Sequence, residues 1–368
     1  MVAVTFKIYK MSQMPKKKIL FFLPSTIGGA ERMTIAIAKM LPRDLFDVKF
    51  VVVHKSLSKV TAFIPKGYEC IHIPIHNIYC ATTLRMMRII RKEKADVVFC
   101  SLLYLNVRLI VAAKLCGVKV VVRNNIELSK CTTRLNPMLV KFTYRWADII
   151  IAQQEEMYDE LIKLPRVSQD KVIVMHNPLD YDTINKKSTA ASPYTTNESG
   201  FLKYVCVGRF ALEKGQDILV KAFERVKAQI KEAHLYIVGK YDWNKPFDRD
   251  VKDYVESHHL ADCVHFVGFD ENPYRWVKHC DCYVMPSRQE GLPNALIEAM
   301  FLKRPVVATL CIPVIGRIVK DGYNGYLAES ENVSSLALCM LKALELKHFE
   351  MTYQPTPKES FIKVFMNI

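Results

Sequence analysis

The sequence lacks any uninterrupted apolar run of the roughly 18–20 residues that a membrane-spanning helix requires. The nearest approach, residues 109–122, is interrupted by Lys114, Gly117 and Lys119. The N-terminus also lacks the order of charge, apolar segment and small-residue cleavage site that marks a signal peptide. We therefore expect a cytoplasmic protein whose contact with a membrane is peripheral, and Met14 is an alternative start to Met1.

The sequence also lacks the residue patterns of metal sites and nucleic-acid-binding modules. Cys280 and Cys282 do not have zinc-knuckle spacing, and no matching Cys/His pair lies near them. The eleven cysteines are odd in number and lie mostly in apolar runs, which indicates reduced thiols. No RNP, zinc-finger or helix-turn-helix signal is present. We expect no metal, no cofactor and no nucleic-acid partner.

The positive charge of the chain is confined to one half. Residues 1–190 carry 30 Lys and Arg against 15 Asp and Glu, whereas residues 191–368 carry 22 of each. A basic half indicates an anionic membrane surface or an anionic substrate as partner. Residues 83–92 combine apolar and basic side chains at helical spacing. They fit either an interfacial helix on anionic lipid or a packed helix with a solvated basic face.

Short apolar, β-branched runs alternate with helical patterns along both halves of the chain. Such alternation predicts parallel sheets covered by helices on both faces, and a length of 368 residues suits two such cores. We expect strands at 19–23, 48–53, 70–75, 97–100, 118–122, 149–152 and 172–175, then at 204–207, 235–238, 264–267, 282–285 and 306–308. The predicted domains are 14–180 and 201–346, with a linker at 181–200 and a short tail at 347–368.

The most informative segment is residues 287–300, in which two carboxylates, Glu290 and Glu298, flank a helix start. Pro293 suits the first helical position because its φ is already helical. The next amides would point out of the helix end and favour an anion, and they belong to Asn294, Ala295 and Leu296. Backbone amides that bind a diphosphate, together with carboxylates that accept hydrogen bonds from sugar hydroxyls, suit glycan chemistry. An ordinary strand–loop–helix unit with solvated glutamates is the alternative.

A second segment places two cations after a strand and a glycine turn. Gly208 and Arg209 follow the apolar run at 204–207, and Lys214 and Gly215 precede a helical pattern. The planar guanidinium of Arg209 can donate two hydrogen bonds to phosphate oxygens, while the Lys214 ammonium contributes a point charge. A single cation in a loop would be interpreted as a solvated side chain, but two cations near one pocket can neutralise a pyrophosphate.

These segments resemble the retaining family 4 glycosyltransferases of the GT-B fold. The resemblance spans roughly residues 16–345. It is carried by Gly28-Gly29-Ala30-Glu31-Arg32, by the segment 208–215, and by Glu290 and Glu298 at a spacing of eight. It implies an α/β protein with two Rossmann-like domains facing each other across a cleft.

The resemblance also implies roles for individual residues. Arg209 and Lys214 would hold the donor diphosphate and stabilise the leaving-group charge, Glu290 would bind the transferred sugar, and Glu298 the donor ribose. Further donor contacts are expected at Gly29, Gly208, Gly268, Gly291, Leu292, Pro293, Asn294, Ala295 and Leu296. Sugar or acceptor contacts are expected at Gly28, Asn124 and Asn125.

Three features depart from the family pattern. The histidine that many relatives carry near Asn124 is absent, so that asparagine either contacts a sugar or only caps its strand. Lys303 and Arg304 replace a small residue and glycine, and the loop 309–315 lacks a glycine pair. We also expect the tail, with Pro355 and Pro357, to leave little room for the family's final helix, which crosses back onto the first domain.

The function predicted from the sequence is a retaining, metal-independent transfer of a hexose or N-acetylhexosamine. The donor would be a nucleotide-diphosphate sugar, most simply a UDP-sugar, and the acceptor a glycan or lipid-linked glycan in surface polysaccharide synthesis. A catalytically idle GT-B subunit that binds a nucleotide-sugar or a partner enzyme is the alternative. A sugar-nucleotide epimerase on the same fold fits the glutamate spacing less well.

Overall fold

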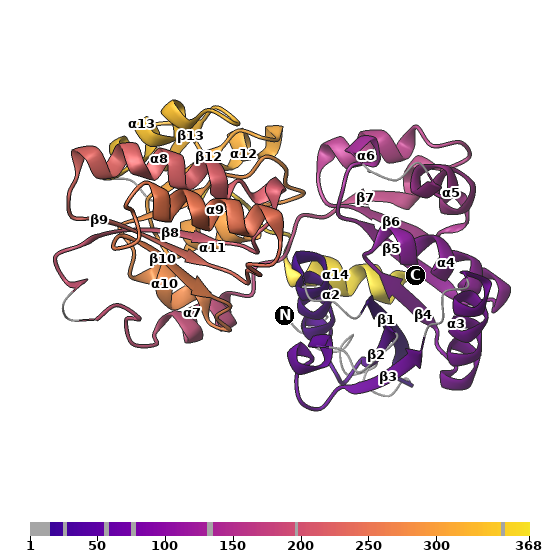
Figure 1. Ribbon diagram of the computed structural model, residues 1–368. Coiled ribbons are helices and arrows are strands. Elements are labelled where there is room, and N and C mark those ends of the chain that lie inside the picture. The colour runs from indigo at the N-terminus through magenta and orange to yellow at the C-terminus, as the bar shows by residue number, and fades with distance from the viewer. Residues whose placement is uncertain are drawn as a thin grey trace, which may run out of the picture. The chain divides into compact units, whose positions relative to one another are not determined.

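In the computed structural model the chain forms two compact units. The structure describes residues 15–24, 28–54, 59–74, 79–130, 135–195, 198–346 and 350–368. The first unit comprises the chain up to Pro178 together with residues 355–368, and the second comprises residues 179–354. Each unit is built on one parallel β-sheet with helices packed against it (Figure 1). The two predicted α/β domains are therefore present.

The sheet of the first unit has seven described strands in the order β3-β2-β1-β4-β5-β6-β7. Every apolar run predicted as a strand in this half forms one. The strands are β1 (Lys17–Pro24), β2 (Phe46–His54), β3 (Glu69–Pro74), β4 (Val97–Cys100), β5 (Lys119–Asn124), β6 (Ile149–Ala152) and β7 (Val172–Val174). All of their pairings are parallel.

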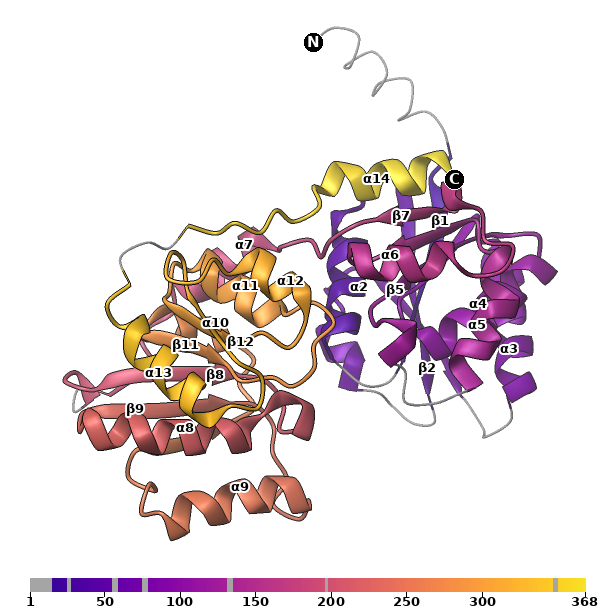
Figure 2. The same cartoon turned by 90° about the horizontal axis from the view of Figure 1, so that it is seen from above.

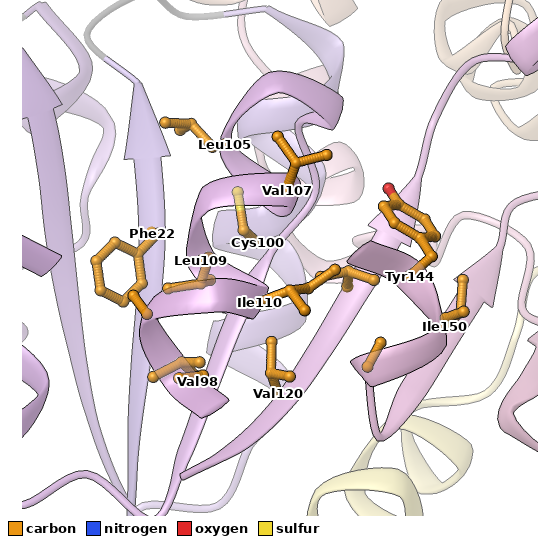
Figure 3. Close-up of a cluster of buried hydrophobic side chains, with 14 of the residues drawn as sticks. Phe22, Val98, Cys100, Leu105, Val107, Leu109, Ile110, Val120, Tyr144 and Ile150 are labelled. Atoms are coloured by element: carbon orange, nitrogen blue, oxygen red, sulfur yellow. The ribbon is translucent and has the colours of Figure 1, made fainter. Parts of the chain in front are cut away.

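Helices cover both faces of this sheet because successive strand residues point to opposite sides and both sets are apolar. Leu20 and Phe22 face one cluster, which Figure 3 shows beneath α4, and Phe21 faces the other. The first cluster is covered by α3 (Tyr79–Glu93), α4 (Leu103–Leu115), α5 (Leu135–Thr143) and α6 (Glu155–Ile162). The second is covered by α2 (Gly29–Met40) and α14 (Lys358–Asn367).

The second unit has six described strands in the order β10-β9-β8-β11-β12-β13. These are β8 (Leu202–Val207), β9 (Ala233–Val238), β10 (Val264–Gly268), β11 (Cys282–Met285), β12 (Val306–Thr309) and β13 (Tyr326–Ala328). The three-residue β13 was not predicted. The helices are α7 (Tyr181–Ser188), α8 (Gln216–Gln229), α9 (Pro246–Ser257), α10 (Pro273–Lys278), α11 (Asn294–Phe301), α12 (Pro313–Ile318) and α13 (Val333–Ala343).

The stretch expected to be a linker packs on the second unit. Its first eight residues form α7, whose N-terminus is capped by Asp180 accepting from the Thr183 amide. Ile184 is buried in the core, and the Tyr194 hydroxyl donates to the Trp276 carbonyl at 3.0 Å. These contacts could not be predicted from the polar composition of the stretch, because residues that cap helices and form turns are themselves polar.

The expectation that the chain end leaves little room for a helix is wrong. Residues 358–367 form α14, which lies along the first unit in Figure 2, and Phe361 and Phe365 are fully buried there. The Phe365 ring lies 5.7 Å from that of Phe21, centroid to centroid. Pro357 is the N-cap of the helix, so the prolines precede the helical segment and do not interrupt it.

Candidate functional site

Two of the predicted segments lie together at one edge of the second sheet. β8 and β11 are neighbouring parallel strands, so their carboxyl ends lie at the same edge. The segment 208–216 leaves β8 there, and the segment 286–293 leaves β11. Ligands of such sheets bind beyond the carboxyl ends of the strands.

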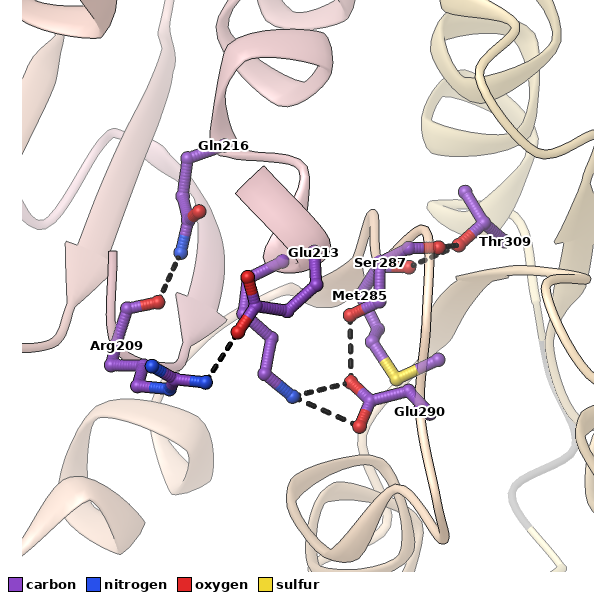
Figure 4. A network of polar contacts seen from close by, with 8 residues as sticks. Arg209, Glu213, Gln216, Met285, Ser287, Glu290 and Thr309 are labelled. Atoms are coloured by element: carbon purple, nitrogen blue, oxygen red, sulfur yellow. Dashed lines mark hydrogen bonds and ion pairs between the residues drawn. The ribbon is translucent and has the colours of Figure 1, made fainter. Parts of the chain in front are cut away.

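Lys214 and Glu290 form the centre of this edge (Figure 4). The Lys214 Nζ donates to both carboxylate oxygens of Glu290, at 2.8 and 2.9 Å. The Ser287 hydroxyl donates to Glu290 Oε1 at 2.7 Å, and the Thr309 hydroxyl donates to the Ser287 carbonyl. The Lys214 side chain is 27% exposed and that of Glu290 10% exposed, so the pair is largely screened from water yet open to a ligand.

Close backbone approach sets the path of these segments. Gly215 has a φ of +67°, and a Cβ there would lie 2.1 Å from the Pro286 carbonyl oxygen. A Cβ on Gly239, which follows β9, would lie 1.7 Å from the Gly208 carbonyl oxygen. Only glycine fits at both positions, so these residues allow three strand ends to meet without side chains between them.

Arg288 links the two segments, and sequence reasoning missed it. Its guanidinium donates to both carboxylate oxygens of Asp217 at 2.8 Å, and to the Leu212 carbonyl at 2.8 Å. Its backbone amide donates to the Glu213 carbonyl at 2.8 Å. The available signal was an arginine two residues before Glu290, but its partner Asp217 lies 71 residues earlier in the sequence.

Arg209 lies on the same segment as Lys214 but forms a different contact. Its guanidinium pairs with Glu213, one turn further along, and 69% of its side chain is exposed. Its backbone carbonyl accepts from the buried Gln216 side chain at 2.9 Å. The structure therefore brings Lys214 and Glu290 together, whereas the Arg209 guanidinium pairs with Glu213.

The helix after Glu290 begins one residue later than predicted, because Pro293 is the N-cap of α11 and not its first residue. The Asn294 amide donates to the Leu292 carbonyl, and the Ile297 amide makes the first helical bond, to Pro293. Gly291 is half-buried and Leu292 buried just before the helix. In the described chain no acceptor is assigned to the amides of Ala295 and Leu296, as expected of a helix start.

Glu298 lies in α11, inside the helix as predicted. The Tyr274 hydroxyl of α10 donates to its Oε1 at 3.3 Å. Tyr283 of β11 is fully buried, and its pKa is raised well above its usual range, mainly by burial and further by charges that include Glu290 and Glu298. Both carboxylates therefore act electrostatically on the strand that precedes them.

Two thiols lie within the electrostatic reach of the Lys214–Glu290 pair. Burial raises the pKa of Cys206 to about 12, although Lys214 opposes this. Burial, with a contribution from Glu290, raises the pKa of Cys311 to about 11. Both stay neutral thiols near pH 7, so they add no charge to the site and are poor nucleophiles.

Gly208 and Gly268 lie on this edge on either side of the end of β9. The Gly208 amide donates to the Val238 carbonyl at 3.0 Å, and the Gly268 carbonyl accepts from Gly239 at 2.8 Å. Phe269, which follows, is half exposed. Sequence reasoning missed the aromatic cluster beside them, in which the rings of Tyr241 and Trp243 stack at 4.0 Å.

In the first unit, Gly28 and Gly29 start α2. The Gly28 amide donates to the carboxylate of the buried Glu31 at 2.8 Å, and Gly29 is the first helical residue. Glu31 therefore satisfies an amide at this helix start. Any ligand contact at Gly28 and Gly29 would have to use other backbone groups.

Asn124 and Asn125 occur at the end of β5, where Asn124 is part of a buried polar network. The Tyr144 hydroxyl donates to Asn124 Oδ1 at 2.7 Å, and the Asn106 amide donates to Tyr144 at 3.0 Å. The buried Asn124 Nδ2 has no acceptor among the described residues, so one donor remains for a ligand. Asn125 is half-buried.

No three His, Cys, Asp or Glu residues in the described ranges are grouped closely enough to hold a metal ion. Similarly, no helix in those ranges has the length and apolarity to cross a bilayer.

Two family descriptions match the chain, one in each unit. The Glycosyltransferase Family 4 profile matches residues 27–183, and the profile described as glycosyl transferases group 1 matches residues 202–346. Together they cover more than half of the chain.

Curated relatives named as glycosyltransferases are similar to this chain at low identity. A glycosyltransferase of Methanocaldococcus jannaschii is 28% identical over 243 residues, which are 62% of this chain and 59% of the relative. A Campylobacter jejuni protein is 23% identical over 360 residues, covering 90% of this chain and 91% of the relative. Its name is N-acetylgalactosamine-N,N'-diacetylbacillosaminyl-diphospho-undecaprenol 4-alpha-N-acetylgalactosaminyltransferase.

Among solved structures, HepE of Anabaena in complex with UDP and glucose is similar to this chain with a TM-score of 0.76. The match covers 95% of this chain and 98% of HepE, at 20% sequence identity. This likeness concerns the fold, and it confirms the predicted architecture of two Rossmann-like domains.

Proposed function

Because this chain belongs to the glycosyltransferases of the GT-B fold, we propose that it transfers a sugar from a nucleotide-diphosphate donor with retention of the anomeric configuration. The observation that carries this proposal is the Lys214–Glu290 pair at the carboxyl edge of the second sheet. A diphosphate needs a cation there, and a sugar needs a carboxylate that accepts from its hydroxyls. The structure holds one of each at hydrogen-bonding distance.

In this proposal the residues of the second unit bind the donor. Lys214 contacts the diphosphate, and Arg209, whose exposed guanidinium pairs with Glu213, turns to it when the donor binds. The α11 amides face the same anion. Glu290, fixed by Ser287 and Lys214, keeps one lone pair on Oε2 for a hydroxyl of the transferred sugar, and Glu298 accepts from the ribose.

The proposed chemistry is a front-face displacement. The acceptor oxygen forms a bond to the anomeric carbon on the face from which the diphosphate departs, and the bonding electrons leave with the phosphate oxygen. The acceptor proton passes to that oxygen. Arg209, Lys214 and the helix amides act as preorganised donors aimed at the developing charge, so the proposal invokes no metal.

The substrates are proposed from relatives. HepE was solved with UDP and glucose, which supports a UDP-sugar as donor. The name of the Campylobacter jejuni relative includes a diphospho-undecaprenol glycan, which supports a lipid-linked acceptor. We propose that this protein is a peripheral enzyme of surface polysaccharide synthesis at the inner face of the membrane, where a lipid-linked acceptor would be presented.

The second candidate function is an idle GT-B subunit that binds a nucleotide-sugar without transferring it. The pairing of Arg209 with Glu213 favours it, because a cation held in that pair would not reach the diphosphate. Hydrolysis of a donor by the isolated protein would separate the two candidates, since an idle subunit binds but does not cleave.

The test of donor binding is a thermal-shift panel of UDP, GDP, ADP and their sugars. A ligand at a hundred times its Kd adds about 2.7 kcal/mol of stability. We expect stabilisation by one nucleotide series, lost in Arg209→Ala and in Lys214→Ala. No response to any nucleotide, or an Arg209→Ala protein with an unchanged transfer rate, would contradict the proposal.

A further inference from the structure

The α5 helix and the 3-10 helix that follows it, Tyr144–Trp146, expose large apolar side chains. Met138 and Phe142 are each 56% exposed and Trp146 is 44% exposed, and Leu139 lies beside them. We call these four residues the α5 edge. Val140 and Tyr144 on the opposite side are fully buried against α4 and the sheet. The helix is thus apolar on two sides, and only one of them is used by the fold.

The segment that carries this edge is rich in cations. Helices α3, α4 and α5 lie side by side over one face of the first sheet (Figures 1 and 2). Residues 79–146 contain 13 Lys and Arg against 3 Asp and Glu, so this segment holds a net +10 of the chain's +15.

Six of these cations make no ion pair with a carboxylate of the described residues. They are Arg85, Arg88, Arg91, Lys92, Lys141 and Arg145. By contrast, Lys49, Lys214 and Arg288 are each paired with a carboxylate. With only three carboxylates in residues 79–146, the positive charge of this segment is not neutralised locally.

Aromatic and cationic groups are also in contact on this face. The Arg145 guanidinium lies 4.9 Å from the Trp146 ring centroid, and that of Arg108 lies 5.9 Å from the Tyr104 ring centroid. Both rings are exposed. Tryptophan and tyrosine rings beside arginine are typical of the zone where a bilayer changes from acyl chains to headgroups.

We propose that the outer face of α3, α4 and α5 docks on an anionic lipid bilayer, with the α5 edge inserted among the lipids and the four exposed cations, Arg88, Arg91, Lys92 and Lys141, against the headgroups. This docking surface rests on the proposed function, because a bilayer would present the lipid-linked acceptor to the enzyme. It also extends the surface expected from residues 83–92, because the inserting side chains lie on α5.

A second copy of the chain does not fit this face. A two-fold interface would set the same patch against itself, and thus the same four cations against each other. An anionic surface is the partner that complements both the charge and the apolar edge. Each basic residue near such a surface strengthens binding by about five-fold, and salt weakens this contribution.

The test is flotation of the full chain with vesicles of phosphatidylcholine containing about 30% phosphatidylglycerol, at about 50 mM and about 500 mM NaCl. We expect binding at low salt, loss at high salt, and no binding to pure phosphatidylcholine. The variant Phe142→Ser/Trp146→Ser and the variant Arg88→Gln/Lys92→Gln/Lys141→Gln should each lower binding by about ten-fold or more.

Matched controls lie outside the face. Leu338→Ser removes a 52% exposed apolar side chain from α13, and Lys231→Gln/Lys342→Gln/Lys363→Gln removes three exposed cations. Both controls should bind vesicles like the wild type. Circular dichroism and thermal unfolding check that each variant is folded.

Several results would overturn the inference. They are failure of the wild type to bind anionic vesicles, wild-type binding by both surface variants, and a wild-type dimer that Phe142→Ser/Trp146→Ser converts to monomer. Nucleotide thermal shifts on the same preparations separate the two proposals. Normal donor binding without vesicle binding contradicts only the docking surface, whereas vesicle binding without any nucleotide response contradicts only the proposed function.

Discussion

Arg288 offers the sharpest test of how the candidate site is held. It joins the segment that carries Glu290 to the segment that carries Lys214, through Asp217 and the Leu212 carbonyl. We therefore consider Arg288→Met, which keeps much of the side-chain length but removes the charged fork, and Arg288→Lys, which keeps the charge alone.

The magnitude follows from the contacts. A bidentate ion pair is strong when it is shielded from water. The side chains of Arg288 and Asp217 are 20% and 27% exposed, so solvent screening weakens this pair. We expect Arg288→Met to lower the free energy of unfolding by about 1–2 kcal/mol. A displacement of about 1 Å between catalytic groups costs about a hundred-fold in rate, so turnover should fall by about ten- to a hundred-fold.

The assay is donor affinity and transfer rate beside urea unfolding, in the wild type, both Arg288 variants and a control. The control is Lys49→Met, which removes the two ion pairs of Lys49 with Glu69 and Glu93 from the first unit. It should lose comparable stability without changing donor affinity. Arg288→Lys should recover only part of the loss. If Arg288→Met is destabilised as expected but binds and turns over donor within two-fold of the wild type, the linking role is refuted.

Three further predictions concern the second unit. Lys214→Met should weaken diphosphate binding by about ten-fold or more in calorimetry, while Lys231→Met, an exposed lysine far from the edge, should not. Gly215→Ala should cost at least about 2 kcal/mol in urea unfolding, whereas Gly322→Ala, with a φ of +72° but open space around it, should cost about 1 kcal/mol. Burial holds the pKa of His234 at about 4 and lowers that of His265, whose ring nitrogen lies 2.9 Å away. Both histidine pKa values are lower in the folded than in the unfolded chain, so the unfolded chain binds more protons as pH falls below about 6.5. The free energy of unfolding should therefore drop by about 1 kcal/mol from about pH 7 to about pH 5. An equal drop in His234→Phe would contradict this origin.

The sheet strands could be predicted because burial on both faces leaves a continuous apolar run in the sequence, as in Val97–Cys100. The elements that were missed carry weaker signals. β13 is three residues long, and α7 is a short helix in a polar stretch. For α14, two prolines pointed away from a helix, although buried phenylalanines four residues apart, Phe361 and Phe365, were the available signal.

The candidate site likewise contains residues that could be predicted from the sequence and residues that could not. Lys214 and Glu290 were predicted from local pattern, and the structure joins them because their strands are neighbours in the sheet. Ser287, Thr309 and Arg288 were missed because their roles depend on partners from other strands and helices. The roles of Lys214, Glu290, Arg209, Glu298 and the α11 amides toward a donor remain predictions.

The return of the chain end to the first unit has a consequence for dividing the protein. A fragment ending at Pro178 would lack α14 and would expose the rings of Phe21 and Phe99, against which Phe365 packs. The second unit, residues 179–354, is by contrast one continuous stretch of sequence and suits expression alone. To obtain the first unit in isolation, residues 355–368 must be supplied with it, either as a separate peptide or rejoined by circular permutation through the Lys17 end, whose Nζ already contacts the Met366 carbonyl at 3.2 Å.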